Sequence, residues 1–109
     1  MSLASEIGAL HLVVGQRDLA LPKLLLLTLA PGDSVILLQE AVWLALATAF
    51  EPDLWSWLPN TCCLFVLRAD LEVRGLADRN LHARVQAVDD PAWVEASERH
   101  ARCITWSHG

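Results

Sequence analysis

Four short apolar runs recur along the chain, and the second and third are almost unbroken. They are Leu10–Val14, Ser34–Leu38, Cys62–Leu67 and Ala83–Val88. Strands buried on both faces of a parallel sheet have this near-continuous apolar character. Helix-like segments lie between the runs, and alternating strands and helices favour right-handed β-α-β units. The sequence therefore predicts the α/β class: a single-domain, three-layer β-α-β sandwich around a mostly parallel sheet of four or five strands.

The segments between the runs contain residues that begin and end helices. We expect helices at Leu19–Leu29, Glu40–Ala49, Asp70–Gly75 and Pro91–Ala101, an irregular connection at Phe50–Asn60, and an edge strand at Arg102–Trp106. Asp18 can cap the first helix, and Pro22 falls in its first turn, where a missing N–H does least harm. Asp70 can likewise cap the third helix, which Gly75 can end in the left-handed conformation. The first and third helices therefore have defined ends.

The chain is rich in apolar residues. They make up 54% of the sequence, which is high for a soluble monomer. Leu24–Leu27 and Leu29 leave the first helix apolar almost all round, which is typical of a helix covered on more than one side, here by the sheet and by a neighbour. Trp55 and Trp57 are candidates for a partner surface. A subunit interface is the simplest destination for this apolar surface.

No segment is expected to enter a membrane or to bind nucleic acid. The densest apolar stretch, Leu19–Ala30, is interrupted by Pro22 and Lys23 and falls short of the about 20 residues of a spanning helix. Residues 1–8 include Glu6 and no basic residue, so the charged start of a secretory signal is missing and we expect a cytoplasmic protein. The net charge is −5, and the 8 Lys and Arg residues form no basic run, which disfavours direct contact with a phosphate backbone.

The sequence contains no G-x-G-x-x-G, no Walker P-loop and no G-x-S-x-G, so nucleotide and hydrolase chemistry have no support. Its 3 cysteines include no C-x-x-C pair and no Cys/His pair at zinc spacing, which argues against a disulfide framework or structural zinc. Glu40 with Glu51 or Asp53 is a candidate carboxylate pair at the strand ends, although acidic residues at helix starts are the simpler explanation. His11 is interpreted as a hydrogen-bonded core or interface histidine. We expect no metal and no cofactor.

The cysteines are the remaining candidates for chemistry, because a persulfide carrier needs only a reactive thiolate. Cys62 and Cys63 fall in the third run, where one side chain faces each side of the sheet and packing is the expected role. Cys103 lies beside Arg102 and near His100, whose charge or N–H groups favour a thiolate. Cys103 is therefore the alternative catalytic candidate, against the simpler interpretation of an edge-strand residue.

Four parts of the chain are similar to one known family. They are Leu10–Leu12, Gly32–Glu40, Leu67–Leu76, and an ending that runs from Val88–Asp89 through Trp93–Val94 to His100 and Trp106. In this order and spacing they resemble the DsrH/TusB family, with Leu67–Leu76 the strongest match. The resemblance spans about residues 10–106, so residues 10–109 are identified as one DsrH/TusB-like domain. Residues 1–9 are interpreted as an N-terminal extension, in which Met1–Leu3 resemble a cloning remnant.

The resemblance implies a DsrE/DsrF/DsrH-like fold and a place in a hetero-oligomer of related subunits. The expected partners are DsrE/TusD-like and DsrF/TusC-like chains, and the isolated chain could form a homo-oligomer. In such assemblies sulfur passes between cysteines as persulfide. The TusBCD branch serves 2-thiolation of the tRNA wobble uridine, and the Dsr branch serves sulfur oxidation. The sequence does not separate the two branches.

The chain departs from the family at positions that matter for chemistry. Some members carry a cysteine in the helix after the first strand, whereas residues 17–30 contain none and Leu25 is near the equivalent position. Glu40–Ala41 stands where the family has Asp-Gly, and Gly15–Arg17 replaces Ser-Pro-Phe. The sequence thus predicts a non-catalytic subunit that supports persulfide transfer in a sulfur-relay complex. The alternatives are a sulfur-accepting subunit that uses Cys103 and a free-standing homo-oligomer with an unknown ligand.

Overall fold

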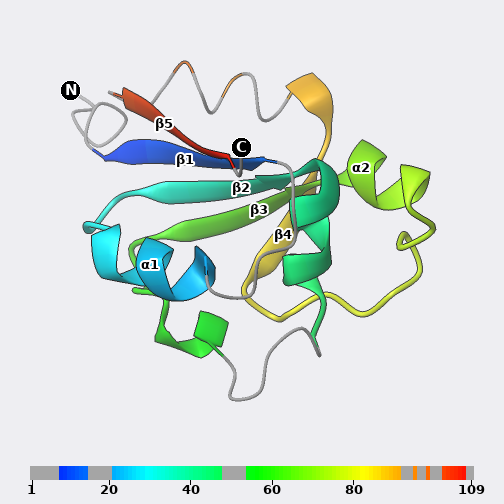
Figure 1. Ribbon diagram of the computed structural model, residues 1–109, viewed down its shortest axis with the longest axis horizontal. Coiled ribbons are helices and arrows are strands. Elements are labelled where there is room, and N and C mark those ends of the chain that lie inside the picture. The colour runs from blue at the N-terminus through cyan, green and yellow to red at the C-terminus, as the bar shows by residue number, and fades with distance from the viewer. Residues whose placement is uncertain are drawn as a thin grey trace.

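Five parallel strands form the sheet in the computed structural model, which describes residues 8–14, 21–47, 54–91, 95, 98 and 102–107. The strands are β1 (Ala9–Val14), β2 (Ser34–Leu38), β3 (Cys63–Leu67), β4 (Val85–Val88) and β5 (Arg102–Ser107). Their order across the sheet is β4-β3-β2-β1-β5, and these pairings are all parallel (Figure 1). The predicted α/β class with a parallel sheet is confirmed.

The strands lie where the apolar runs predicted them, with small shifts at their starts. β1 begins at Ala9, one residue early, in what was predicted to be the N-terminal extension. β4 begins two residues late, because the N–H of Val85 donates to the carbonyl oxygen of His82 at 2.9 Å and closes a turn. The Arg84 guanidinium holds this turn against the preceding loop, with Nη1 2.7 Å from the carbonyl oxygen of Leu58. The predicted C-terminal edge strand forms as β5.

The helices that lie between the strands in the described part of the chain are short. They are α1 (Leu21–Thr28), η2 (Gln39–Ala45), η3 (Leu54–Trp57) and α2 (Arg68–Val73), of which η2 and η3 are 3₁₀ helices. The Asp18 that was expected to cap α1 lies outside the described residues. Of the predicted last helix, Pro91–Ala101, residues 91, 95 and 98 are described and are helical. None of the described helices is long and apolar enough to cross a membrane.

η2 differs from the predicted second helix, Glu40–Ala49, in type and in length. It ends at Ala45, because Leu46 adopts an extended conformation with φ −70° and ψ 146°. Leu46 then forms an antiparallel bridge with Leu81, so its backbone pairs with another segment instead of continuing the helix. The predicted residues 48 and 49 lie outside the described part of the chain.

α2 begins two residues before the predicted third helix. The prediction that Asp70 caps it is wrong, because Leu67 occupies the N-cap position, without a side-chain hydrogen bond. The C-terminal end is as predicted. Gly75 has φ +70°, and the N–H of Leu76 donates to the carbonyl oxygen of Leu71 at 2.8 Å, as in a Schellman motif. Gly75 therefore ends α2 in the left-handed conformation.

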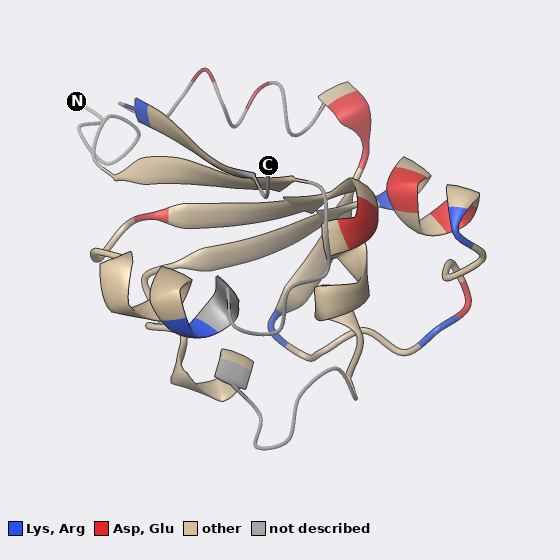
Figure 2. Cartoon of the chain, viewed as in Figure 1, with Lys and Arg blue, Asp and Glu red and all other residues tan. Residues whose placement is uncertain are grey.

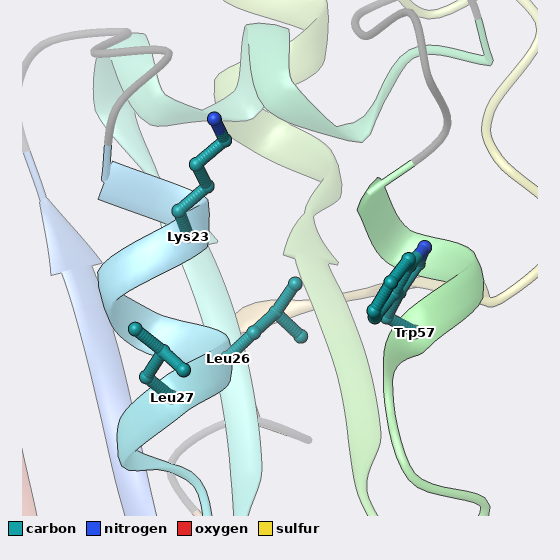
Figure 3. Close-up of a pocket in the computed structure, with 4 residues that line it drawn as sticks. All are labelled: Lys23, Leu26, Leu27 and Trp57. Carbon is teal, nitrogen blue, oxygen red and sulfur yellow. The ribbon is translucent and has the colours of Figure 1, made fainter.

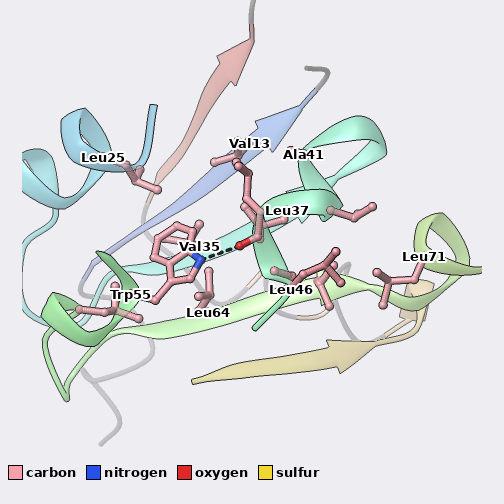
Figure 4. Packing of buried hydrophobic residues seen from close by; sticks show 14 of the residues in the cluster. Val13, Leu25, Val35, Leu37, Ala41, Leu46, Trp55, Leu64 and Leu71 are labelled. Carbon is pink, nitrogen blue, oxygen red and sulfur yellow. Dashed lines mark hydrogen bonds between the residues drawn. The ribbon is translucent and has the colours of Figure 1, made fainter. Parts of the chain in front are cut away.

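One face of the sheet carries the main hydrophobic cluster, covered by α1, η2 and η3 (Figure 4). The central strands contribute Val13, Leu37 and Val66, which lie side by side in register. Leu25 of α1 and Trp55 of η3 pack in the same cluster. Trp55 is completely buried, and its Nε1–H donates to the carbonyl oxygen of Leu44 at 2.7 Å. The prediction that Trp55 lies on a partner surface is therefore wrong.

Gly8 precedes β1 at a point where two stretches of backbone touch. Its φ is +91°, and a Cβ at this position would lie 2.3 Å from the carbonyl oxygen of Gly32. A side chain would therefore meet both a disfavoured backbone conformation and the backbone of the neighbouring turn. Glycine at position 8 allows β1 to begin against that turn.

Gly8→Ala should lower the free energy of unfolding by about 2 kcal/mol or more, because strain at positive φ adds to the clash with Gly32. Gly75→Ala is the matched control: its φ is also positive, at +70°, but nothing lies within 4 Å of the added Cβ. The control should therefore lose only about 1 kcal/mol. Urea unfolding measures both values, and equal losses would contradict a role for the close backbone contact.

Candidate functional site

His11 lies at the centre of a buried hydrogen-bonded chain. Its side chain is 1% exposed and sits between Asp33 and Trp106. Nε2 of His11 lies 2.9 Å from Oδ2 of Asp33, and Nε1 of Trp106 lies 2.9 Å from Nδ1 of His11. The prediction of a hydrogen-bonded core histidine is confirmed. Its two partners were not identified from the sequence, because they lie far from His11 along the chain and form no motif with it.

The Trp106 indole decides which nitrogen of His11 carries the hydrogen. An indole N–H can only donate, so Nδ1 of His11 must accept, and Nε2 carries the hydrogen that faces Asp33. Both ring nitrogens are thus occupied by partners within the chain. These two hydrogen bonds join β1 to Asp33 and to Trp106 of β5.

Asp33 receives two further hydrogen bonds. The N–H of Ala9 donates to Oδ1 at 2.8 Å, and the N–H of Ala30 donates to Oδ2 at 3.1 Å. Burial by itself would raise the pKa of Asp33, but the hydrogen bonds from His11, Ala9 and Ala30 stabilise the carboxylate more strongly, so its pKa lies below the ordinary value. One charged carboxylate therefore joins the start of β1, the turn after α1 and the His11 side chain.

Cys62 is a packed thiol. Its side chain is 4% exposed, and its Sγ lies 3.4 Å from the carbonyl oxygen of Ala30, to which it donates. Burial raises the pKa of this thiol, and the nearby charge of Asp33 raises it further. The reactive thiolate is disfavoured here, and the predicted packing role of Cys62 is confirmed.

Cys63 and Cys103 are exposed. Cys63 opens β3 and faces the side of the sheet opposite Cys62, so the prediction that it is a packed residue is wrong. Across the sheet, Cys103 pairs with Leu10, Leu10 with Ser34, and Ser34 with Cys63. The two exposed thiols therefore lie on one face at the amino ends of their strands. Three strand spacings of about 4.8 Å put them roughly 14 Å apart, too far for direct sulfur exchange.

A charged cluster closes the carboxyl ends of β2 and β3. Gln39 follows β2 with φ +55°, in the left-handed region, and its N–H donates to Oδ2 of Asp70 at 2.7 Å. Nε of Arg74 donates to Oε1 of Glu40 at 2.9 Å, and Nη1 of Arg74 lies 3.7 Å from Oδ1 of Asp70. Glu40, a candidate for a carboxylate pair, is thus ion-paired with Arg74, and its candidate partners at positions 51 and 53 lie outside the described residues.

Within the described part of the chain, no group of three or more His, Cys, Asp or Glu residues could hold a metal ion.

α1 and η3 expose an apolar surface beside the core. Leu24 and Leu27 are 56% and 85% exposed, and Trp57 is 76% exposed. Leu26 extends from α1 toward Trp57, and these two side chains line a hollow of about 420 Å³ together with Leu27 and Lys23 (Figure 3). We call these five residues the α1–η3 patch. Trp57, a predicted partner-surface residue, is exposed, and its contact with a partner stays a prediction. α1 has one side in the core and the other exposed.

Asp33→Asn should lower the free energy of unfolding by about 3 kcal/mol near neutral pH, because an amide NH₂ would face N–H donors that now meet a carboxylate. In the wild type, the unfolded chain takes up a proton on Asp33 at a higher pH than the folded chain does. The stability from Asp33 should therefore be complete above the unfolded pKa of about 4 and be lost as the pH falls through the folded pKa. Urea titrations from neutral to acid pH measure this loss, and an Asn variant with an unchanged acid profile would contradict the role of Asp33.

Alkylation of the native protein should separate the three thiols. Cys63 and Cys103 should react with iodoacetamide in the folded state, whereas Cys62 should react about 100-fold more slowly, since it must wait for an opening that costs about 3 kcal/mol. Peptide mass spectrometry over a time course gives the three rates. In urea the rates should become similar, and a fast Cys62 in the native protein would contradict its buried position.

Comparisons with known proteins agree with the resemblance of the four sequence segments. The model of the family described as DsrH like protein matches residues 17–103. The chain is 36% identical over 86 residues to Protein TusB of Serratia proteamaculans (strain 568), a match that covers 79% of this chain and 86% of that protein. The residues matched by the family model include α1, the strands β2, β3 and β4 with the helices between them, and the start of β5. The chain therefore belongs to the DsrH/TusB family of sulfur-relay subunits.

Proposed function

We propose that this protein is a non-catalytic subunit of a cytoplasmic, hetero-oligomeric sulfur-relay complex. Its partners are DsrE/TusD-like and DsrF/TusC-like chains, and it supports persulfide transfer between their cysteines. The observation that carries the proposal is the packing of Leu25, near the position at which some members of the family have a cysteine. This side chain is 1% exposed and belongs to the core. A leucine cannot carry sulfur, so this position serves the fold instead.

The α1–η3 patch supports an assembled state for the protein. Most of the surface of the Leu27 and Trp57 side chains is exposed to solvent. Burying a side chain of this size against a partner typically contributes about 1.5–3 kcal/mol of favourable free energy. Exposed apolar side chains grouped in this way usually mark an interaction surface. A subunit that works inside a complex can keep such a surface, because a partner covers it.

Cys103 carries the second candidate function, that of a sulfur acceptor. It is exposed on the edge strand β5, where a partner's persulfide could approach. In this reaction the Cys103 thiolate attacks the outer sulfur of the partner's persulfide. A sulfur–sulfur bond forms on Cys103, the sulfur–sulfur bond in the partner breaks, and the partner's cysteine leaves as a thiolate. Unlike the first proposal, this one requires the Cys103 thiol.

The similarity to a protein named TusB favours tRNA 2-thiolation over sulfur oxidation. On this proposal, loss of the protein lowers the amount of 2-thiouridine at the tRNA wobble position. The tRNA itself would be bound by other parts of the machinery, because this chain has a net charge of −5 and no basic run.

Cys62→Ala, Cys63→Ala and Cys103→Ser should each restore wobble 2-thiouridine to the wild-type level when they replace the deleted gene. None of these thiols is needed if sulfur passes only between partner cysteines. Mass spectrometry of digested tRNA measures 2-thiouridine, and gel filtration with light scattering confirms that each variant still joins a hetero-oligomer with the partner chains.

Three outcomes would change the proposal. Loss of 2-thiouridine in an assembled Cys103→Ser complex would establish the sulfur-acceptor function instead. A deletion that leaves 2-thiouridine unchanged would exclude the tRNA branch. A stable homo-oligomer that binds neither partner chain would contradict the relay-subunit function as a whole.

A further inference from the structure

We propose that the α1–η3 patch is the docking surface for a partner subunit that presents an apolar ridge flanked by a carboxylate. The ridge enters the hollow between Leu26 and Trp57, and the carboxylate pairs with Lys23. This inference rests on the proposed function, because it assumes that the protein works inside a hetero-oligomer. It goes further by assigning the contact to particular residues and by stating the chemistry of the partner.

The size and shape of the patch suit the centre of an interface. The exposed parts of Leu24, Leu27 and Trp57 together present on the order of 300–400 Å² of apolar surface. A stable interface buries about 800 Å² on each partner, so the patch would supply roughly half of it, with a polar rim for the rest. The hollow of about 420 Å³ beside Leu27 offers a place for an inserted side chain. Interfaces concentrate their binding energy in such central apolar contacts.

The α1–η3 patch is positioned by buried residues of the same two helices, whose side chains point into the core. On α1, Leu25 is buried in the core while Leu24 and Leu27 face outward. On η3, Trp55 is fully buried and hydrogen-bonded, while Trp57, two positions later, is exposed. Each outward side chain therefore stands on an element that is anchored by its inward neighbour. A surface that is already arranged loses less conformational entropy when a partner binds.

The charges around the patch favour a different chain over a second copy of this one. Lys23 is the charged member of the patch, and among the described residues no hydrogen bond or ion pair engages its ammonium group. In the described part of the chain, the Asp and Glu residues lie in α2 and the loop after it, in the first turn of η2, between β4 and β5, and at the buried Asp33 before β2 (Figure 2). There Arg74 pairs with Glu40, and Arg68 pairs with Asp89. Two copies of the five patch residues facing each other would bring two lysines together and contribute no carboxylate of the patch itself, whereas a partner with an acidic residue beside its ridge would complement Lys23.

The test uses the full chain together with DsrE-like and DsrF-like chains from the same genome. Leu27→Asp and Trp57→Ala should each weaken binding to a partner subunit by about tenfold or more, because they place a charge or a gap at the centre of the contact. Val73→Asp is the matched control: Val73 is 79% exposed, but it lies on α2, on the other side of the molecule from α1 (Figure 1). Biolayer interferometry measures Kd, and thermal unfolding confirms that each variant is folded.

A charge reversal tests the partner's chemistry separately. Lys23→Glu should weaken binding, and reversing one Asp or Glu of the partner to Lys should restore it. Rescue by such a partner variant supports the proposed pairing. If no reversal of a partner carboxylate restores binding, the carboxylate part of the proposal is wrong.

The outcomes separate this inference from the proposed function. If the wild-type chain assembles with its partners and Leu27→Asp binds as tightly as Val73→Asp, the docking surface is wrong while the proposed function stands. If Leu27→Asp disrupts a homodimer of the isolated chain but leaves the partner complex intact, the patch serves a second copy and the inference is overturned. If the wild-type chain binds neither partner, both proposals fall.

Discussion

Three N–H groups converge on the Asp33 carboxylate, from Ala9 at the start of β1, from Ala30 after α1, and from His11 within β1. His11 in turn accepts a hydrogen bond from Trp106 of β5. β1 is therefore hydrogen-bonded through side chains to Trp106 of β5 on one side and to Asp33, the residue before β2, on the other. Apolar side chains would tolerate a shift in register more easily than these directional bonds would, because a shifted strand leaves buried donors unpaired. The sheet's register beside β1 depends on this network.

The same network limits the chemistry that the interior can perform. Both nitrogens of His11 are used by partners within the chain, and the charge of Asp33 helps to keep the nearby Cys62 thiol protonated. The buried polar groups therefore stabilise the fold. Chemistry at a thiol of this chain would have to use exposed Cys63 or Cys103, and a relay that passes sulfur only between partner cysteines needs neither.

The proposed docking surface is formed by two elements that each have a buried side and an exposed side. α1 and η3 each place one large apolar side chain in the core and another in solvent. Leu25 and Leu27 are the pair on α1, and Trp55 and Trp57 are the pair on η3. Packing of the inner residues holds the outer ones at defined positions, so the core arranges the surface that a partner subunit would meet.

The sequence by itself determined the α/β class, the places of the strands and the end of α2. The apolar runs have the length and continuity of strands buried on both faces. Gly75 can adopt the left-handed conformation that ends α2 without steric cost, because it has no Cβ. Family membership could also be recognised from the sequence, because four segments match in order and spacing. Each of these conclusions depends on the residue types and their order along the chain, and none requires knowing which distant residues are in contact.

Only the tertiary structure decided how distant residues are paired. Asp33 is 22 positions from His11, and no local pattern connects them. Trp55 and Trp57 look equivalent in the sequence, yet the carbonyl oxygen of Leu44 satisfies one indole in the core while the other faces solvent. Asp70 has the position of a helix cap but bonds to Gln39 at the end of β2. The pattern of apolar and polar residues along the chain indicates which positions are buried. The hydrogen-bond partner of a buried polar atom depends instead on which distant segments the fold brings together.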